Sequence, residues 1–69
     1  MEIRVNGEKK FINTLNKELS LSDALIQLGY NSNNIIVELN NLIVNYEFWK
    51  ENIVIDGDKL EIVSIVGGG

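Results

Sequence analysis

The stretch Leu60–Gly69 reads LEIVSIVGGG. Its first seven residues favour an extended strand, because branched and other apolar side chains dominate them. Three glycines follow, and glycine has no side chain that could pack against a protein core. We therefore expect a last strand from Leu60 to Val66 and then a flexible tail, Gly67–Gly69, which could reach roughly 10 Å beyond the domain.

The N-terminal residues supply a partner for this last strand. Residues 1–5 alternate between apolar and polar side chains, which predicts a half-buried strand. Asn6-Gly7 suits the positive φ angles of a tight hairpin turn. The return strand, residues 8–13, should turn either Phe11 or Ile12 inward. The first and last strands can then pair in parallel at the centre of a sheet.

One helix is expected over Ser22–Leu28. Ser20 and Asp23 fit a capping box at its start, and Gly29 fits a left-handed residue just after its end. Apolar residues recur at helical spacing and make one apolar face. These residues are Leu21, Ala24, Leu25 and Leu28.

Short elements fill the rest of the chain. Residues 35–39 are nearly all apolar, which indicates an inner strand, and Asn40-Asn41 turns the chain into a short strand over residues 42–44. Asn45 should cap a helical turn that places aromatic side chains, Trp49 above all, in or near the core. Residues 53–55 form a brief extended piece before the turn Asp56-Gly57-Asp58.

The order of these elements predicts the fold class. One helix packed on one face of a mixed sheet of four or five strands is an economical α+β arrangement for 69 residues. The order strand, strand, helix, strand, short strand, helical turn, strand is that of the ubiquitin-like β-grasp. We expect one domain over residues 1–66, followed by the tail 67–69.

Composition excludes several kinds of function. The chain has no Cys and no His, which removes disulfides, thiolate metal sites, cysteine nucleophiles and a histidine general base. The net charge is −4 and Lys9-Lys10 is the longest basic run, so nucleic acid is not an expected partner. No apolar segment could span a membrane or serve as a signal peptide, so the expected compartment is the cytoplasm.

The remaining catalytic candidates have structural explanations. Ser20 is better explained as a helix cap than as a nucleophile, since no base accompanies it. Asp56 and Asp58 flank a glycine in a turn, and no further oxygen ligands follow at the spacing of a calcium loop. We therefore expect no metal site, no bound cofactor and no catalytic residue in this chain.

The tail is where chemistry is expected. A C-terminal carboxylate is ionised at neutral pH and is a poor electrophile until it is activated, for instance as an acyl-adenylate. Residues without β-carbons can enter a narrow channel and bring that carboxylate into the active site of another protein. This chain has no machinery for the activation step, so a partner must provide it.

The whole chain resembles the ThiS family, the sulfur carriers of thiamine biosynthesis. The resemblance rests on the segments IRVNGE, LSLSDALIQLG, IIVELNNLIV and DGDKLEIV, and above all on VGGG, Val66–Gly69. It implies that an E1-related, ThiF-like enzyme adenylates the carboxylate of Gly69 with ATP and Mg²⁺. It also implies that a sulfurtransferase system then converts the adenylate to a thiocarboxylate, which a ThiG-like thiazole synthase consumes. Gly67 and Gly68 would act as the thin tether.

Other interpretations remain open on sequence grounds. A carrier of the same fold could serve molybdopterin synthesis, as MoaD-like proteins do, or cysteine synthesis. A non-covalent β-grasp binding module is a rival from another class, and an autonomous enzyme is disfavoured by the missing catalytic residues.

The last strand also predicts a docking surface. Period-two alternation should turn Leu60 and Ile62 toward the helix-covered core, and Glu61, Val63 and Ile65 toward the other side. Exposed apolar side chains next to the tail suggest a face that a partner protein grips, although strand propensity alone could explain Val63. We expect the free chain to be a monomer.

Overall fold

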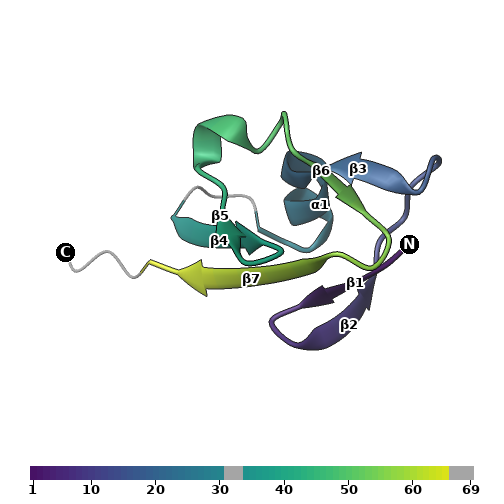
Figure 1. Cartoon of the computed structure of the whole chain (residues 1–69), viewed down its shortest axis with the longest axis horizontal. Helices are drawn as coiled ribbons and strands as arrows, with labels where there is room; N and C mark the ends of the chain where they lie inside the picture. Colours follow the sequence, from purple (N-terminus) through teal and green to yellow (C-terminus); the bar gives the residue numbers. More distant parts are fainter. Residues whose placement is uncertain (31–33, 66–69) are drawn as a thin grey trace.

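The computed structural model describes residues 1–30 and 34–65. Within it, β7 (Lys59–Ser64) is the central strand of a five-stranded sheet. The sheet order is β2-β1-β7-β4-β5 (Figure 1). The strand β1 pairs in parallel with β7, and the other neighbours are antiparallel. The remaining strands are β1 (Glu2–Val5), β2 (Glu8–Phe11), β4 (Ile35–Leu39) and β5 (Leu42–Ile43). The expected mixed sheet, with its parallel first and last strands, is confirmed.

Two turns with positive φ close the hairpins. Asn6 and Gly7 have φ of 51° and 85° between β1 and β2, and Asn40 and Asn41 have φ of 51° and 74° between β4 and β5. Asparagine and glycine tolerate this region better than other residues, which is why these pairs mark tight hairpins. Both predicted turns are therefore confirmed.

The helix α1 (Leu21–Gln27) begins and ends as its sequence predicts, within one residue. The Ser20 hydroxyl accepts a hydrogen bond from the Asp23 amide at 3.1 Å. At the other end Gly29 has φ of 95°, and the amides of Gly29 and Tyr30 donate to the carbonyls of Ile26 and Leu25. This pair of bonds is a Schellman motif, which satisfies carbonyls that the helix leaves free.

A second sheet lies on the helix side of the molecule and was missed by the sequence analysis. The strand β3 (Glu18–Ser20) pairs antiparallel with β6 (Ile53–Ile55). Residues 18–20 are too few to show an alternating pattern, and Ser20 also caps α1, so the helix signal hid the strand. The pairing fixes the start of α1, since Leu21 donates its amide to the carbonyl of Asn52 at 2.7 Å.

The short helix η1 (Tyr46–Phe48) corrects a further expectation. Asn45 precedes it but makes no capping hydrogen bond with its side chain. The Phe48 amide, which such a cap would bind, is already taken by the Asn45 carbonyl at 2.9 Å. The helical turn itself is nevertheless present.

No helix in residues 1–30 and 34–65 is long and apolar enough to cross a membrane.

The core lies between the five-stranded sheet on one side and α1, β6 and η1 on the other. Ile12, not Phe11, is the residue that turns inward from the end of β2, with exposed fractions of 2% and 79%. Leu28 is partly buried beside this core. The buried apolar residues are Ile3, Val5, Ile12, Leu21, Ala24, Leu25, Val37, Trp49, Val54, Leu60 and Ile62.

Candidate functional site on the open face of the sheet

The strand β7 is held along its full length up to Ile65. Asn6 and Ile62 exchange two hydrogen bonds, from the Asn6 side-chain Nδ2 to the Ile62 carbonyl and from the Ile62 backbone amide to the Asn6 Oδ1. On the other side, Lys59 donates its amide to Asn40 Oδ1 at 3.0 Å. The Ile65 amide donates to the carbonyl of Asn34 at 2.9 Å, which extends the pairing with β4 beyond Ser64. The residues that lead to the glycines are therefore fixed in the sheet.

The alternation expected for this strand is confirmed. Leu60 and Ile62 are 0% and 7% exposed and belong to the core, whereas Val63 and Ile65 are 59% and 50% exposed. Glu61 is half-buried on the same side as Val63. This side, the face of the sheet away from α1, is called the open face below.

The register of the sheet gathers apolar side chains at one end of the open face. Ile36 of β4 lies directly opposite Val63 of β7. Ile65 of the same segment and Ile43 of β5 lie diagonally from Ile36, within reach of apolar contact, and Ile43 is directly opposite Glu38. Ile36 and Ile43 are 42% and 67% exposed. We call Ile36, Ile43, Val63 and Ile65 the apolar patch; Ile65 lies two residues before Gly67 in the sequence.

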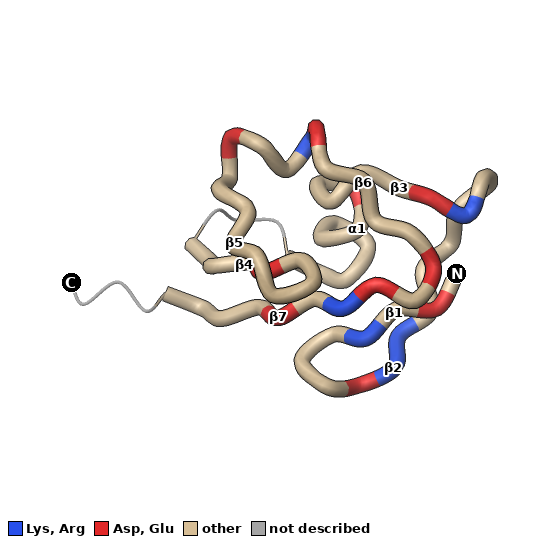
Figure 2. Tube along the Cα trace, in the orientation of Figure 1, with Lys and Arg blue, Asp and Glu red and all other residues tan. Residues whose placement is uncertain are grey.

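Charged side chains occupy the next two rows of the open face. Glu38 lies directly opposite Glu61, and we call these two residues the acidic pair. One row further, Lys9, Arg4 and Lys59 are neighbours across β2, β1 and β7, and we call them the basic row. Figure 2 shows the same order along β7, with uncharged residues at its C-terminal end and mixed charges toward β1 and β2. Along β7 the open face thus runs from apolar through acidic to basic, with Ile43 of β5 beside Glu38 in the acidic row.

Two residues of the open face, Ile36 and Glu38, could have been identified from the sequence but were not. The nearly apolar sequence of β4 indicated an inner strand, and β4 does lie between β7 and β5, but only Ile35, Val37 and Leu39 face the core. Glu38, two residues after Ile36, was the signal that one side of this strand is open. Glu61, Val63 and Ile65 do lie together, as expected, but Gly67–Gly69 fall outside the described residues.

The acidic turn between β6 and β7 is structural. The carboxylate of Asp56 accepts the Glu2 amide at 2.7 Å, and that of Asp58 accepts the Ile55 amide at 2.8 Å and the Asn40 side-chain amide at 3.0 Å. Carboxylates that satisfy backbone and side-chain donors in this way hold a turn in place. In the part of the chain that the structure describes, no group of three acidic side chains could hold a metal ion.

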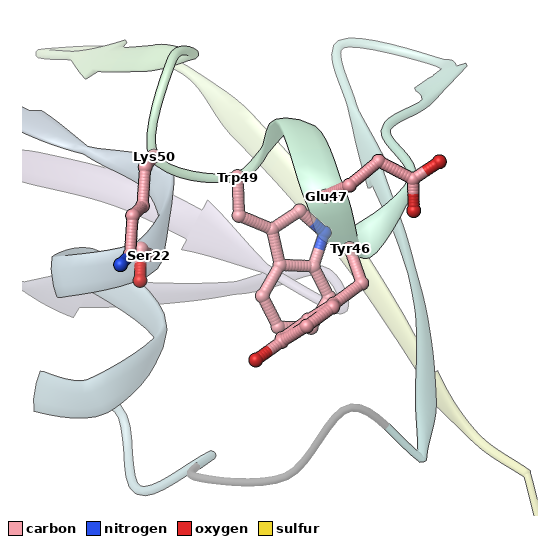
Figure 3. A pocket seen from close by; sticks show the side chains of 5 residues that line it. All are labelled: Ser22, Tyr46, Glu47, Trp49 and Lys50. Carbon is pink, nitrogen blue, oxygen red and sulfur yellow. The ribbon is translucent and has the colours of Figure 1, made fainter.

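A small hollow lies beside η1. It has a volume of about 220 Å³ and is lined by side chains from α1 and from the segment around η1, as Figure 3 shows. Trp49 is 6% exposed, packs edge-on against Tyr46 with ring centres 5.0 Å apart, and donates its indole N–H to the Val44 carbonyl at 2.9 Å. Its indole is committed to the core, as the sequence predicted, and the hollow is smaller than ordinary ligand sites.

The topology and the open face together define the class: the molecule is a ubiquitin-like β-grasp domain. A crystal structure of the thiamine biosynthesis protein ThiS from Geobacter metallireducens has the same fold, with a TM-score of 0.84 and 28% sequence identity over all of both chains. The sequence matches the ThiS family over residues 3–69, and the chain belongs to that family.

Two curated relatives extend this comparison. An uncharacterized protein, ycf40, from Trieres chinensis is 39% identical over 66 residues, which cover 94% of this chain and 85% of that protein. A thiazole synthase from Paramagnetospirillum magneticum is 36% identical over 69 residues, all of this chain but 20% of that much longer protein.

Proposed function

We propose that this chain is a sulfur carrier whose working atom is the carboxyl carbon of Gly69. The Gly69 carboxylate attacks the α-phosphorus of ATP, pyrophosphate leaves, and an acyl-adenylate forms. A hydrosulfide equivalent then attacks the carbonyl carbon and AMP leaves, which gives a thiocarboxylate. The carrier finally donates this sulfur to the thiazole ring made in thiamine biosynthesis. An oxygen atom from the acceptor substrate or from water replaces it on the carbonyl carbon, so the carboxylate returns.

One observation carries this proposal: the match to the ThiS family runs from residue 3 through Gly69 and so includes the glycines. The anchoring of β7 up to Ile65 supports it, since a fixed strand presents whatever follows it at a defined point. A tail of residues without β-carbons, Gly67 and Gly68, could then thread into a partner's active site.

The partners follow from the ThiS family to which the chain belongs. The chain has no Cys and no His, so a partner must activate the carboxylate. Membership in the ThiS family points to an E1-like, ThiF-like adenylyltransferase that uses ATP and Mg²⁺. Sulfur comes from a sulfurtransferase system, and the acceptor enzyme is a ThiG-like thiazole synthase. The thiazole synthase relative supports this last assignment, because a segment that matches the whole of this chain lies within that one polypeptide. The chain itself acts as a co-substrate, with no bound cofactor.

The open face is assigned to docking. Val63 and Ile65 are half or more exposed and shortly precede the tail in the sequence, and Glu61 lies on the same side. A partner that covers the apolar patch removes this surface from water and so gains binding free energy where the tail enters its active site.

Intact mass after an activation reaction tests the proposal. The chain is incubated with the ThiF-like enzyme of the same organism, ATP, Mg²⁺ and a sulfur source. We expect the mass gain of one oxygen exchanged for sulfur, mapped to Gly69, and no gain in a matched chain that lacks Gly69. An unchanged mass with an enzyme that is active on another carrier would contradict the proposal. Thiazole formation in a reaction completed with the synthase then identifies the pathway.

A further inference from the structure

The acidic pair on the open face is an unfavourable arrangement for the isolated chain. Glu38 and Glu61 are paired directly across β4 and β7, where β-carbons lie about 4.5–5.5 Å apart. Both side chains are half-buried. Like charges that face each other across two strands destabilise the sheet.

Nothing in the described part of the chain neutralises this pair. Lys10 and Glu8 form the ion pair found there, with Nζ and Oε2 3.7 Å apart, and no Lys or Arg comes within 4.0 Å of either carboxylate of the acidic pair. Asn6, at the end of β1 beside β7, has its amide engaged with the Ile62 peptide. The two carboxylates therefore have unused acceptor capacity on an exposed face.

The position of the acidic pair beside the apolar patch indicates which group of a partner protein would contact it. Along the strands, Glu38 and Glu61 are two residues from Ile36 and Val63, about 7 Å away, so a partner that covers the apolar patch also covers the acidic pair. Covering removes water, and the effective dielectric falls. Two carboxylates that share such a site need a positively charged donor between them.

We propose that the acidic pair is a specificity-determining contact that receives an arginine side chain of the activating enzyme. This inference rests on the proposed function, because it assumes that the open face docks on that enzyme. A guanidinium is planar and has five N–H donors, so it can bond to both carboxylates at once, whereas an ammonium is a point charge. The contact discriminates between partners, since an enzyme without a basic group there leaves two carboxylates unpaired.

The basic row gives the contact a direction. Lys9, Arg4 and Lys59 lie one row beyond the acidic pair and farther from the apolar patch. A matching partner presents an apolar surface, then a basic group, then acidic groups, in that order. Rotated by half a turn about the acidic pair, the same partner would set its acidic groups against the apolar patch and its apolar surface against the basic row, so charges on both sides would lose their partners. The bands therefore favour the orientation in which all three match.

The test compares two double variants with the same net charge. Glu38→Gln/Glu61→Gln removes the acidic pair, and Glu47→Gln/Glu51→Gln removes two exposed glutamates around η1; each changes the net charge from −4 to −2. Affinity for the ThiF-like enzyme is measured directly, by titration calorimetry, alongside the KM and kcat of adenylation. We expect the first variant to bind at least about tenfold more weakly, with KM raised and kcat unchanged. We expect the control to stay within about twofold of the unaltered chain.

Further readouts separate this contact from folding and from general charge. The acidic-pair variant should melt at the same temperature as the unaltered chain or higher, since a repulsion is removed. Its affinity should depend less on salt than that of the control. Equal affinity of both variants would overturn the inference. If the unaltered chain binds the enzyme but gains no sulfur, the proposed function fails, and the ratio of the two affinities still decides the role of the pair. If the unaltered chain does not bind the enzyme, both fail.

Discussion

Asn6 and Ile62 exchange a pair of hydrogen bonds that join β1 to β7 where β1 has already ended. Asn6 Nδ2 donates to the Ile62 carbonyl at 3.1 Å, and the Ile62 amide donates to Asn6 Oδ1 at 2.7 Å. The side-chain amide thus takes the place of a strand peptide beside the central strand. Because Asn6 also has φ of 51° in the hairpin turn, one residue both turns the chain and fixes the strand that leads to the tail.

Replacing Asn6 by glycine should lower the free energy of unfolding by about 1–3 kcal/mol, because the peptide groups of the buried Ile62 lose both of these hydrogen-bond partners. Glycine accepts the positive φ, so the change isolates the hydrogen bonds. The matched control is Asn41→Gly, at φ of 74°, where we expect a change within about 0.5 kcal/mol. Urea unfolding of both variants measures this. Equal stabilities would contradict the role given to Asn6.

The apolar face of α1 supports a second stability prediction. Leu25 is 1% exposed in the core, so truncation to alanine should lower the free energy of unfolding by about 2–5 kcal/mol. Ile26, the next residue on the same helix, is 59% exposed, and its change to alanine should cost less than about 0.5 kcal/mol. Thermal or urea unfolding of both variants measures the difference. A loss well under about 1 kcal/mol for Leu25→Ala would place this side chain outside the core.

Local signals explain what the sequence could predict. Ser20, Gly29 and the pair Asn6-Gly7 each act through their own backbone conformation or a hydrogen bond a few residues away. The sides of β7 also followed from the sequence, because alternation along a strand needs no knowledge of its neighbours. These features were sufficient to arrange one helix against a mixed sheet.

Features that depend on distant partners could not be predicted. That Glu38 faces Glu61 follows from the register of β4 on β7, which is set by packing between strands more than twenty residues apart. The strand β3 exists because β6 pairs with it, and its three residues carry no pattern of their own. Only part of the candidate docking face could therefore be predicted from the sequence. Its side chains on β7 were predicted, and those on β4 and β5 were not.

The tail supports a prediction about activation. Gly68→Val adds a branched β-carbon at the position that is proposed to thread into the activating enzyme, so adenylation should slow by at least about tenfold, equivalent to 1.4 kcal/mol. The control places the same substitution in an exposed loop, Asn16→Val, and should leave the rate unchanged. Release of pyrophosphate measures the rate, and the melting temperatures of both variants should match that of the unaltered chain. Adenylation of Gly68→Val at the unaltered rate would rule out a narrow channel.

The apolar patch supports the last prediction, on docking. Val63→Thr with Ile65→Thr keeps the branched shape that strands favour but adds hydroxyl groups to two exposed side chains. The domain should stay folded, and the affinity for the ThiF-like enzyme should fall by about tenfold, or 1.4 kcal/mol, because desolvating a hydroxyl without a partner is unfavourable.

The control for this change is Ile55→Thr on β6, a strand of the second sheet, where the side chain is 51% exposed. It removes a similar exposed apolar side chain outside the open face, so its affinity for the enzyme should not change. Calorimetric titration of the enzyme and circular dichroism of each variant separate binding from folding. Docking through Val63 and Ile65 is wrong if their double variant binds as tightly as Ile55→Thr. It is wrong also if the double variant unfolds, since the two side chains would then serve stability rather than a partner.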